Sequence, residues 1–99
     1  MGQKLTLISP NWVVYMILCS DNSLYTGITT DLGRRFRLHC NAKGAKYFRG
    51  RQPVEVVYAE VGHNRSTASK REFAIKKLKL AEKTLLIASA SNQLIKDQV

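Results

Sequence analysis

Apolar side chains are densest near the start of the chain, in the stretch from Trp12 to Cys19. This stretch is rich in Val, Ile and aromatic residues, a composition typical of a central, buried strand. Polar residues with turn chemistry follow from Ser20 to Ser23, and a second short strand pattern runs from Leu24 to Ile28. The order predicts an antiparallel β-hairpin.

The next apolar pattern is helical and predicts a helix from about 31 to 41, ending near Gly44. Thr30 or Asp31 can accept the first free amide hydrogens of this helix. One apolar stripe recurs at every fourth position and consists of Leu32, Phe36 and Cys40.

Residues 43 to 52 are basic and interrupted by glycine, which predicts a loop with one short helical turn. Pro53 then opens a third strand, whose apolar residues alternate imperfectly with polar ones up to Val61. The residues from Gly62 to Asn64 predict the next loop.

Two helices follow in the predicted order. The first is long, is capped by Asn64 or Ser66, and runs to about Ala81. The second is short and runs from Glu82 to about Ala90. Helices of this kind pack on a small sheet to bury their apolar faces.

Ninety-nine residues are enough for one modest hydrophobic core. We expect a flexible lead-in over residues 1–11, a single domain over 12–90 and a frayed polar tail over 91–99. The expected fold class is α+β, a three-stranded antiparallel sheet flanked by helices.

The charge balance suggests a polyanionic partner. Sixteen Lys and Arg stand against seven Asp and Glu, a formal net charge of +9, and nucleic acid is the commonest polyanion for such a domain. Between Asp31 and Glu55 there is no acidic residue, and Phe36, Tyr47 and Phe48 are interleaved with the basic ones. These aromatic rings could stack on bases or belong to the core. The segment predicts a nucleic-acid-binding surface made by Arg34, Arg35, Arg37, Lys43, Lys46, Arg49 and Arg51.

The two cysteines, Cys19 and Cys40, have no metal-type spacing and lie on apolar faces of predicted elements. Buried free thiols in a reducing compartment are the favoured interpretation, and a single disulfide is the alternative. The apolar run from 12 to 19 is too short to span a membrane, and no small-residue cleavage site follows it. We therefore expect a cytoplasmic protein.

Arg35 and His39 are four residues apart on the predicted helix and project side by side. A guanidinium can clamp the extra negative charge of a phosphoryl transition state, and an imidazole can orient a water or transfer a proton. Tyr15 and Tyr25 lie on the two hairpin strands, and a tyrosine acts as a base only if cations or a metal-bound water lower its pKa. Each of these residues has an ordinary structural role as the alternative.

Glu72 borders the apolar stripe of the long helix, about 40° from Ala68. A carboxylate beside a core face needs a partner, which is either a hard divalent cation or a basic side chain such as Arg71, Arg35 or a lysine. One carboxylate suffices for Mg²⁺ only where substrate phosphate and water supply the other ligands.

Together these residues resemble the GIY-YIG nuclease domain, and the resemblance runs from about Trp12 to Ile87. The matching motifs are Val13-Val14-Tyr15, Tyr25-Thr26-Gly27, Arg35, His39 and Glu72. Two segments resemble the small stand-alone bacterial members in particular, residues 24–31 and 43–47.

The resemblance implies metal-dependent hydrolysis of a nucleic acid phosphodiester. Tyr15 and Tyr25 would be the motif tyrosines, one of them activating the nucleophilic water. Arg35 would stabilise the transition state, His39 would support the nucleophile, and Glu72 would hold one Mg²⁺ or Mn²⁺.

The chain departs from the family pattern in three places. Val13 and Val14 stand at the first glycine and the middle position of the first motif, and Thr26 replaces an apolar residue in the second. The asparagine that many members have about a dozen residues after the glutamate is also missing: Thr84 stands there, and the next asparagine is Asn92.

The leading hypothesis is an endonuclease acting on nucleic acid, expected to be DNA. Its intrinsic sequence specificity is expected to be low, because the chain is expected to lack the separate recognition domain of family nucleases. A protein partner would then supply specificity. The alternative is a nucleic-acid-binding module with a weak or silent catalytic site, and a third possibility is an adaptor whose basic face meets an acidic protein.

Overall fold

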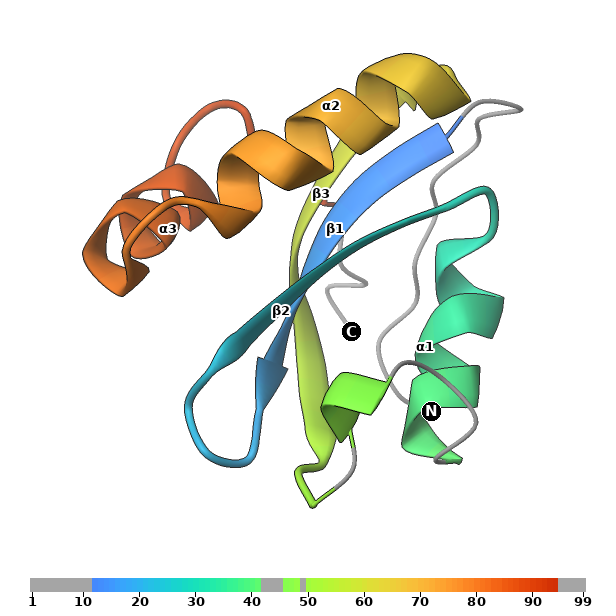
Figure 1. The fold of residues 1–99 in the computed structure, drawn as a ribbon, viewed down its shortest axis with the longest axis vertical. Helices are drawn as coiled ribbons and strands as arrows, with labels where there is room; N and C mark the ends of the chain where they lie inside the picture. Colours follow the sequence, from blue (N-terminus) through green and yellow to red (C-terminus); the bar gives the residue numbers. More distant parts are fainter. Residues whose placement is uncertain (1–11, 42–45, 49, 95–99) are drawn as a thin grey trace, which may run out of the picture.

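The structure is a computed structural model that describes residues 12–41, 46–48 and 50–94. Its sheet is antiparallel and has the order β2-β1-β3, with β1 in the centre (Figure 1). The strands are β1 (Trp12–Cys19), β2 (Leu24–Thr29) and β3 (Pro53–His63). The helices are α1 (Leu32–Cys40), the short 3-10 helix η1 (Lys46–Phe48), α2 (Arg65–Lys76) and α3 (Leu80–Ile87). The predicted α+β class and three-stranded antiparallel sheet are confirmed.

The central strand β1 is buried on both faces because successive side chains point to opposite sides of the sheet. Its odd-numbered residues share a core with α1, η1 and β3, formed by Val13, Tyr15, Ile17, Cys19, Leu32, Phe48, Val56 and Ala59. Its even-numbered residues share a second core with α2 and β3, formed by Val14, Met16, Tyr58, Ala68 and Ile75. Helices α1 and α2 therefore cover opposite faces of the sheet.

Strand β3 is longer than its sequence pattern predicts. Gly62 and His63, expected in a loop, belong to the strand, and Gly62 has φ +85°, a backbone conformation that favours glycine. Trp12 pairs with His63 while Val14 pairs with Glu60, so β3 contains one extra residue at this point. Such bulges re-aim side chains, which explains the imperfect alternation of apolar residues along this strand.

The long helix predicted from Asn64 to about Ala81 is in fact two helices. Helix α2 ends at Lys76 and α3 begins at Leu80, so the short helix starts earlier and ends earlier than expected. Asn64 is confirmed as the cap of α2, accepting the Thr67 amide hydrogen at 2.8 Å. None of the helices in the described residues is long and apolar enough to cross a membrane.

Helix α1 begins at Asp31, whose carboxylate accepts the Arg34 amide hydrogen at 3.1 Å. Both cysteines are free, as expected, but only Cys19 is buried. The expected burial of Cys40 is wrong, because this residue is exposed. The buried position is taken by His39, which is 1% exposed. At about 100° per residue, His39 lies only about 20° from the direction of Leu32 on the helix, whereas Cys40 lies about 80° away.

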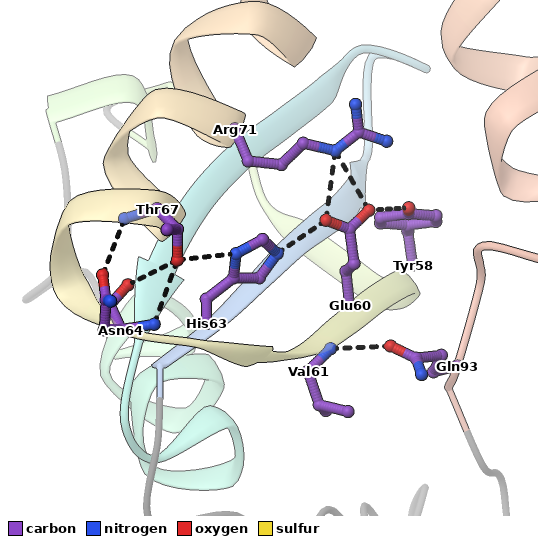
Figure 2. Close-up of polar contacts among 8 residues, drawn as sticks. All are labelled: Tyr58, Glu60, Val61, His63, Asn64, Thr67, Arg71 and Gln93. Carbon is purple, nitrogen blue, oxygen red and sulfur yellow. Dashed lines mark hydrogen bonds and ion pairs between the residues drawn. The ribbon is translucent and has the colours of Figure 1, made fainter.

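A polar network fixes α2 on β3 (Figure 2). Glu60 accepts hydrogen bonds from the Tyr58 hydroxyl at 2.5 Å and from Arg71 Nε at 3.1 Å, and His63 Nε2 lies 2.7 Å from it. Burial alone would raise the pKa of Glu60, but these partners together hold it below its ordinary value. Because Arg71 is held toward β3, the next residue along the helix, Glu72, points about 100° away from that direction.

The start of the segment expected to fray is docked on β3. Asn92 Oδ1 accepts the Ala59 amide hydrogen at 3.2 Å, and its Nδ2 donates to the carbonyls of Val57 and Ile87 at 2.9 Å each. Gln93 adds a backbone bond to the Ala59 carbonyl at 2.8 Å. The ordered chain thus continues past the predicted domain end at residue 90, and residues 95–99 lie outside the described residues.

Candidate active site

The site begins at the pairing of β1 with β2, where Tyr15 stands opposite Gly27. The phenol ring of Tyr15 lies against the glycine: a Cβ at position 27 would be 2.6 Å from the Tyr15 hydroxyl oxygen and 3.0 Å from Tyr25 Cε2. Any side chain at position 27 would therefore displace these phenols. The glycine of the Tyr-Thr-Gly motif makes the space that the first tyrosine occupies.

Tyr15 and His39 form a buried hydrogen-bonded pair between β1 and α1. The Tyr15 hydroxyl oxygen lies 3.0 Å from His39 Nε2, and both side chains are almost completely buried. Burial, with a smaller effect of the Arg35 charge, lowers the pKa of His39 to about 4. Burial also raises the pKa of Tyr15 well above its ordinary value. At neutral pH the pair is therefore uncharged, with a neutral imidazole beside a protonated phenol.

Tyr25 is the more accessible of the two motif tyrosines and is only partly buried. Its ring lies 5.2 Å from the His39 ring, 5.2 Å from Tyr47 and 4.9 Å from Phe48, measured between centroids. These ring contacts, edge-on to His39 and tilted to Tyr47 and Phe48, hold the Tyr25 ring in place on the outer strand β2. Of the two motif tyrosines, Tyr25 is therefore the one that keeps some exposure to solvent.

Arg35 projects from α1 toward both tyrosines. Its guanidinium lowers the pKa of Tyr15 through a hydrogen bond and through its charge, and its charge also reaches Tyr25 and His39. Arg35 Nε is buried and has no hydrogen-bond partner among the described residues, and neither has His39 Nδ1. Buried donors are normally satisfied, so these two atoms suggest a ligand that completes the site.

Glu72 enters the site from α2, on the other face of the sheet. Its Oε2 lies 3.3 Å from Lys76 Nζ, and the two side chains are 23% and 51% exposed. Burial raises the pKa of Tyr25, the charges of Lys76 and Arg35 oppose this effect, and Glu72 reinforces it. Tyr25 is thus under the influence of charged groups from both layers.

The structure therefore brings together the five side chains that the sequence singles out, Tyr15, Tyr25, Arg35, His39 and Glu72. They come from β1, β2, α1 and α2, far apart along the chain. An arginine and a carboxylate near two phenols carry the charges that a phosphate and a cation require.

The donor set at Glu72 suits a cation that the substrate helps to hold. Among the described residues, no group of three or more His, Cys, Asp and Glu could form a metal site. A hard cation bound to Glu72 would need its other oxygen ligands from phosphate and water, an arrangement that Mg²⁺ accepts readily. Thr84 gives no support here, since its hydroxyl donates to the Leu80 carbonyl, and Asn92 is engaged on β3.

The predicted nucleic-acid-binding residues differ in where they lie. Arg34 and Arg37 are exposed on α1. Lys46 belongs to η1, whereas Lys43 and Arg49 lie outside the described residues.

Arg51 has a structural partner. Its Nε donates to Asp21 at 2.8 Å, and its guanidinium lies 4.0 Å above the Tyr47 ring. Hydrogen bonds from Ser23 and, to a smaller extent, from Arg51 lower the pKa of Asp21 to about 2. Phe48 is 6% exposed and belongs to the core, so it is not available for stacking on a base.

The residue at this site that the sequence reasoning missed is Lys76. The signal was present, because Glu72 and Lys76 are four residues apart on a helix with the acid first, the spacing of a side-chain ion pair. The sequence predicts a lysine as one possible partner of Glu72 but does not single out Lys76.

Comparisons with known proteins agree with this geometry. The sequence matches the family model of the GIY-YIG catalytic domain over residues 11–85. It is 50% identical over 82 residues to a UPF0213 protein of Desulfotalea psychrophila, a match that covers 82% of this chain and 74% of the relative. It is also 50% identical over 78 residues to a UPF0213 protein of Clostridium perfringens, covering 79% of this chain and 84% of the relative.

A solved structure is similar as well. It is the solution NMR structure of a UPF0213 protein from Bacillus halodurans, whose sequence is 37% identical to this chain. The match covers 84% of this chain and 88% of that protein, with a TM-score of 0.53. The family match spans the strands and helices that supply all five side chains of the site. On these grounds the chain belongs to the GIY-YIG catalytic domain family, as its small bacterial relatives and the arrangement of its two tyrosines indicate.

Proposed function

We propose that this protein is a metal-dependent endonuclease that hydrolyses phosphodiester bonds of nucleic acid, in the first place DNA, with low intrinsic sequence specificity. Membership of the GIY-YIG family supports a nuclease-type function. The observation that carries the proposal is the buried Nε of Arg35, which has no hydrogen-bond partner among the described residues although the guanidinium lies beside the motif tyrosines.

In the proposed reaction, Arg35 binds the scissile phosphate. Its buried Nε lacks a protein partner in the described part of the chain, so a phosphate oxygen would satisfy it without displacing an existing bond. The guanidinium of Arg35 would stabilise the additional negative charge of the pentavalent transition state more than the charge of the ground state.

Tyr25 is the better placed phenol to accept a proton from the attacking water. Tyr15 is fully buried and already bonded to His39, so we assign it to positioning. Tyr25 must first lose its own proton to solvent: burial raises the pKa of Tyr25, and the charges of Lys76 and Arg35 offset part of this rise. The water oxygen then bonds to phosphorus as one of its protons passes to the Tyr25 phenolate, the bond from phosphorus to one ester oxygen breaks, and the departing alkoxide takes a proton from solvent.

Glu72 would hold Mg²⁺ or Mn²⁺ at this site. When bound, such a cation lowers the pKa of the attacking water or stabilises the departing alkoxide. The exposed Arg34 and Arg37 on α1 would bind phosphates that flank the reacting one. A protein partner would supply specificity that the domain itself lacks.

A cleavage screen tests the proposal. Purified protein is incubated with duplex, single-stranded, branched and RNA oligonucleotides in Mg²⁺, in Mn²⁺ and in EDTA. We expect cleavage of at least one DNA substrate that depends on the metal, and loss of about a thousandfold or more of that rate in Glu72→Gln.

The matched control for Glu72→Gln is Glu82→Gln. Glu82 caps the start of α3 by accepting the Lys79 amide hydrogen at 2.9 Å, and glutamine keeps an acceptor there. Both variants lose one negative charge, so only a role of Glu72 in the reaction separates them. If the protein binds DNA with a steep salt dependence but cleaves none of these substrates, the domain is a binding module and the nuclease proposal is wrong.

A further inference from the structure

Lys76 is a charged side chain next to Glu72, and the reaction above gives it only an electrostatic effect on Tyr25. Its ammonium group lies 3.3 Å from the Glu72 carboxylate, on the same helix one turn later. Its charge, like that of Arg35, also lowers the pKa of Tyr25 against the larger effect of burial. A second cation is thus placed beside the residues that would bind the metal and the phosphate.

The position of Lys76 creates a competition. A divalent cation and an ammonium group both seek the same carboxylate, and two positive charges within about 4 Å repel each other. Among the described residues no group of three or more His, Cys, Asp and Glu exists that could offset this repulsion at Glu72. In the absence of substrate, Lys76 must therefore weaken metal binding.

A phosphodiester removes this conflict. Lys76 is half exposed, and its flexible stem allows the ammonium group to leave Glu72 for a nearby acceptor. A phosphate bound to Arg35 beside Tyr25 would offer such an acceptor. With Lys76 on the phosphate, the Glu72 carboxylate would be free to hold a divalent cation.

We propose that Lys76 exchanges between two partners, the Glu72 carboxylate and the substrate phosphate. In the free protein it pairs with Glu72 and weakens the binding of a divalent cation there. Once a cation is bound to Glu72, Lys76 binds the phosphodiester instead. This inference rests on the proposed metal-dependent function and adds a residue and a coupling to it. Metal and nucleic acid then strengthen each other's binding, since linkage between two sites is reciprocal. Because the free protein binds the metal weakly, the metal-bound site forms mainly when nucleic acid is also bound.

The chain offers a matched control for Lys76 in the next residue. Lys77 has the same charge, but its Nζ lies 4.2 Å above the Phe73 ring, an exposed contact outside the site. Lys76→Gln and Lys77→Gln both lower the net charge by one. A difference between them reports the position of the charge and not its general effect.

The first measurement is Mn²⁺ binding to free protein, followed by the electron paramagnetic resonance signal of unbound Mn²⁺. We expect Lys76→Gln to bind Mn²⁺ about five- to tenfold more tightly than wild type, and Lys77→Gln to remain within about twofold. Glu72→Gln should lose this binding. Equal Mn²⁺ affinity in the two lysine variants would overturn the inference.

The second measurement is fluorescence anisotropy with a labelled phosphorothioate DNA duplex that resists cleavage. In EDTA the two lysine variants should bind the duplex equally, within about twofold, because Lys76 is then held by Glu72. In Mn²⁺, Lys76→Gln should bind about tenfold more weakly than Lys77→Gln, the loss of one charge-assisted phosphate contact. Equal binding of the duplex by both variants in Mn²⁺ would show that Lys76 does not contact phosphate.

The failures of the two proposals are distinguishable. If Glu72→Gln binds Mn²⁺ as well as wild type, Glu72 is not the metal ligand, and both the metal-dependent function and the exchange of Lys76 are wrong. If Glu72→Gln loses Mn²⁺ but Lys76→Gln behaves like Lys77→Gln, the metal site stands and only the role of Lys76 is wrong.

Discussion

The Tyr15 hydroxyl occupies the place where a side chain at Gly27 would be, with 2.6 Å between the hydroxyl oxygen and an added Cβ. This contact explains why the second motif contains a glycine even though its backbone is an ordinary strand. The two residues face each other across β1 and β2, so the glycine of one motif and the tyrosine of the other form one structural unit.

Gly27→Ala is therefore expected to destabilise the protein by about 2 kcal/mol or more, because Tyr15 can move only by leaving His39. Urea unfolding followed by circular dichroism measures the change. Gly33→Ala is the control: a Cβ there would meet Arg37 Nη1 at an ordinary 3.5 Å. That change should stabilise α1 by about 0.5 kcal/mol. Equal effects of both substitutions would contradict the proposed contact.

The buried His39 should make stability depend on pH. The pKa of His39 is about 4 in the folded protein and about 6.5 when unfolded, so the unfolded chain binds more protons between these values. The free energy of unfolding should fall as pH drops from about 6.5 to about 4, by up to about 3 kcal/mol, and this contribution should be constant above pH 7. Denaturant unfolding of wild type and His39→Gln at several pH values isolates the effect. A parallel pH profile for the two proteins would show that His39 does not titrate in this way.

Replacing Thr26, which stands at an apolar position of the family motif, should increase the stability of the protein. Its hydroxyl is buried and has no hydrogen-bond partner in the described part of the chain. Thr26→Val should raise the free energy of unfolding by about 1 kcal/mol, since it removes an unsatisfied buried hydroxyl.

Thr29 on the same strand provides the opposite control for Thr26. Its Oγ1 accepts the Asp31 amide hydrogen at 3.1 Å, just before α1. Thr29→Val should lower the free energy of unfolding by about 0.5 to 1 kcal/mol in the same urea experiment. A loss of stability in both variants would mean that the Thr26 hydroxyl is satisfied in solution.

The sequence predicts correctly those strands and helix caps that depend on neighbouring residues in the chain. The bounds of β1 match the apolar run from Trp12 to Cys19, and the caps at Asp31 and Asn64 follow from residue type and position. The residues of the site were also identifiable, because a hairpin followed by a helix brings Tyr15, Tyr25 and Arg35 together by topology alone.

The errors arise where distant contacts decide. The bulge at Gly62 extends β3 through residues that resemble a turn, and the helix break at 77–79 has no glycine or proline to mark it. His39 rather than Cys40 shares the buried direction of Leu32 on α1, and its partner there, the Tyr15 hydroxyl, comes from a distant strand. The docking of Asn92 depends on side-chain bonds to a strand more than 30 residues away, which no periodicity in the sequence records.

Asn92 should therefore be important for stability, although it lies beyond the predicted end of the domain. Its side chain bonds to Ala59, Val57, Ile87 and Leu94. At about 1 kcal/mol for each bond lost, Asn92→Ala should lower the free energy of unfolding by about 3 to 4 kcal/mol. Gln93→Ala is the control and should cost less than about 1 kcal/mol, since its exposed side chain makes one bond, to the Val61 amide. Similar small losses in both variants would mean that the tail frays in solution.

The exposed arginines of α1 should differ from Arg51 in how they bind nucleic acid. The charge of Arg51 is already balanced by Asp21 at 2.8 Å, and its guanidinium is stacked on Tyr47. Arg34 and Arg37 are exposed on the helix that also carries Arg35, so they can release counterions from a bound duplex.

Arg34→Gln and Arg37→Gln should each reduce the slope of log affinity against log salt concentration by about one, whereas Arg51→Gln should leave it nearly unchanged. Fluorescence anisotropy with a labelled duplex in EDTA, over a series of salt concentrations, measures the three slopes without cleavage. All three variants remove one positive charge, so a general loss of net charge predicts equal slopes. Three equal reductions would therefore place Arg51 on the phosphate-binding surface and show that its ion pair with Asp21 opens when nucleic acid binds.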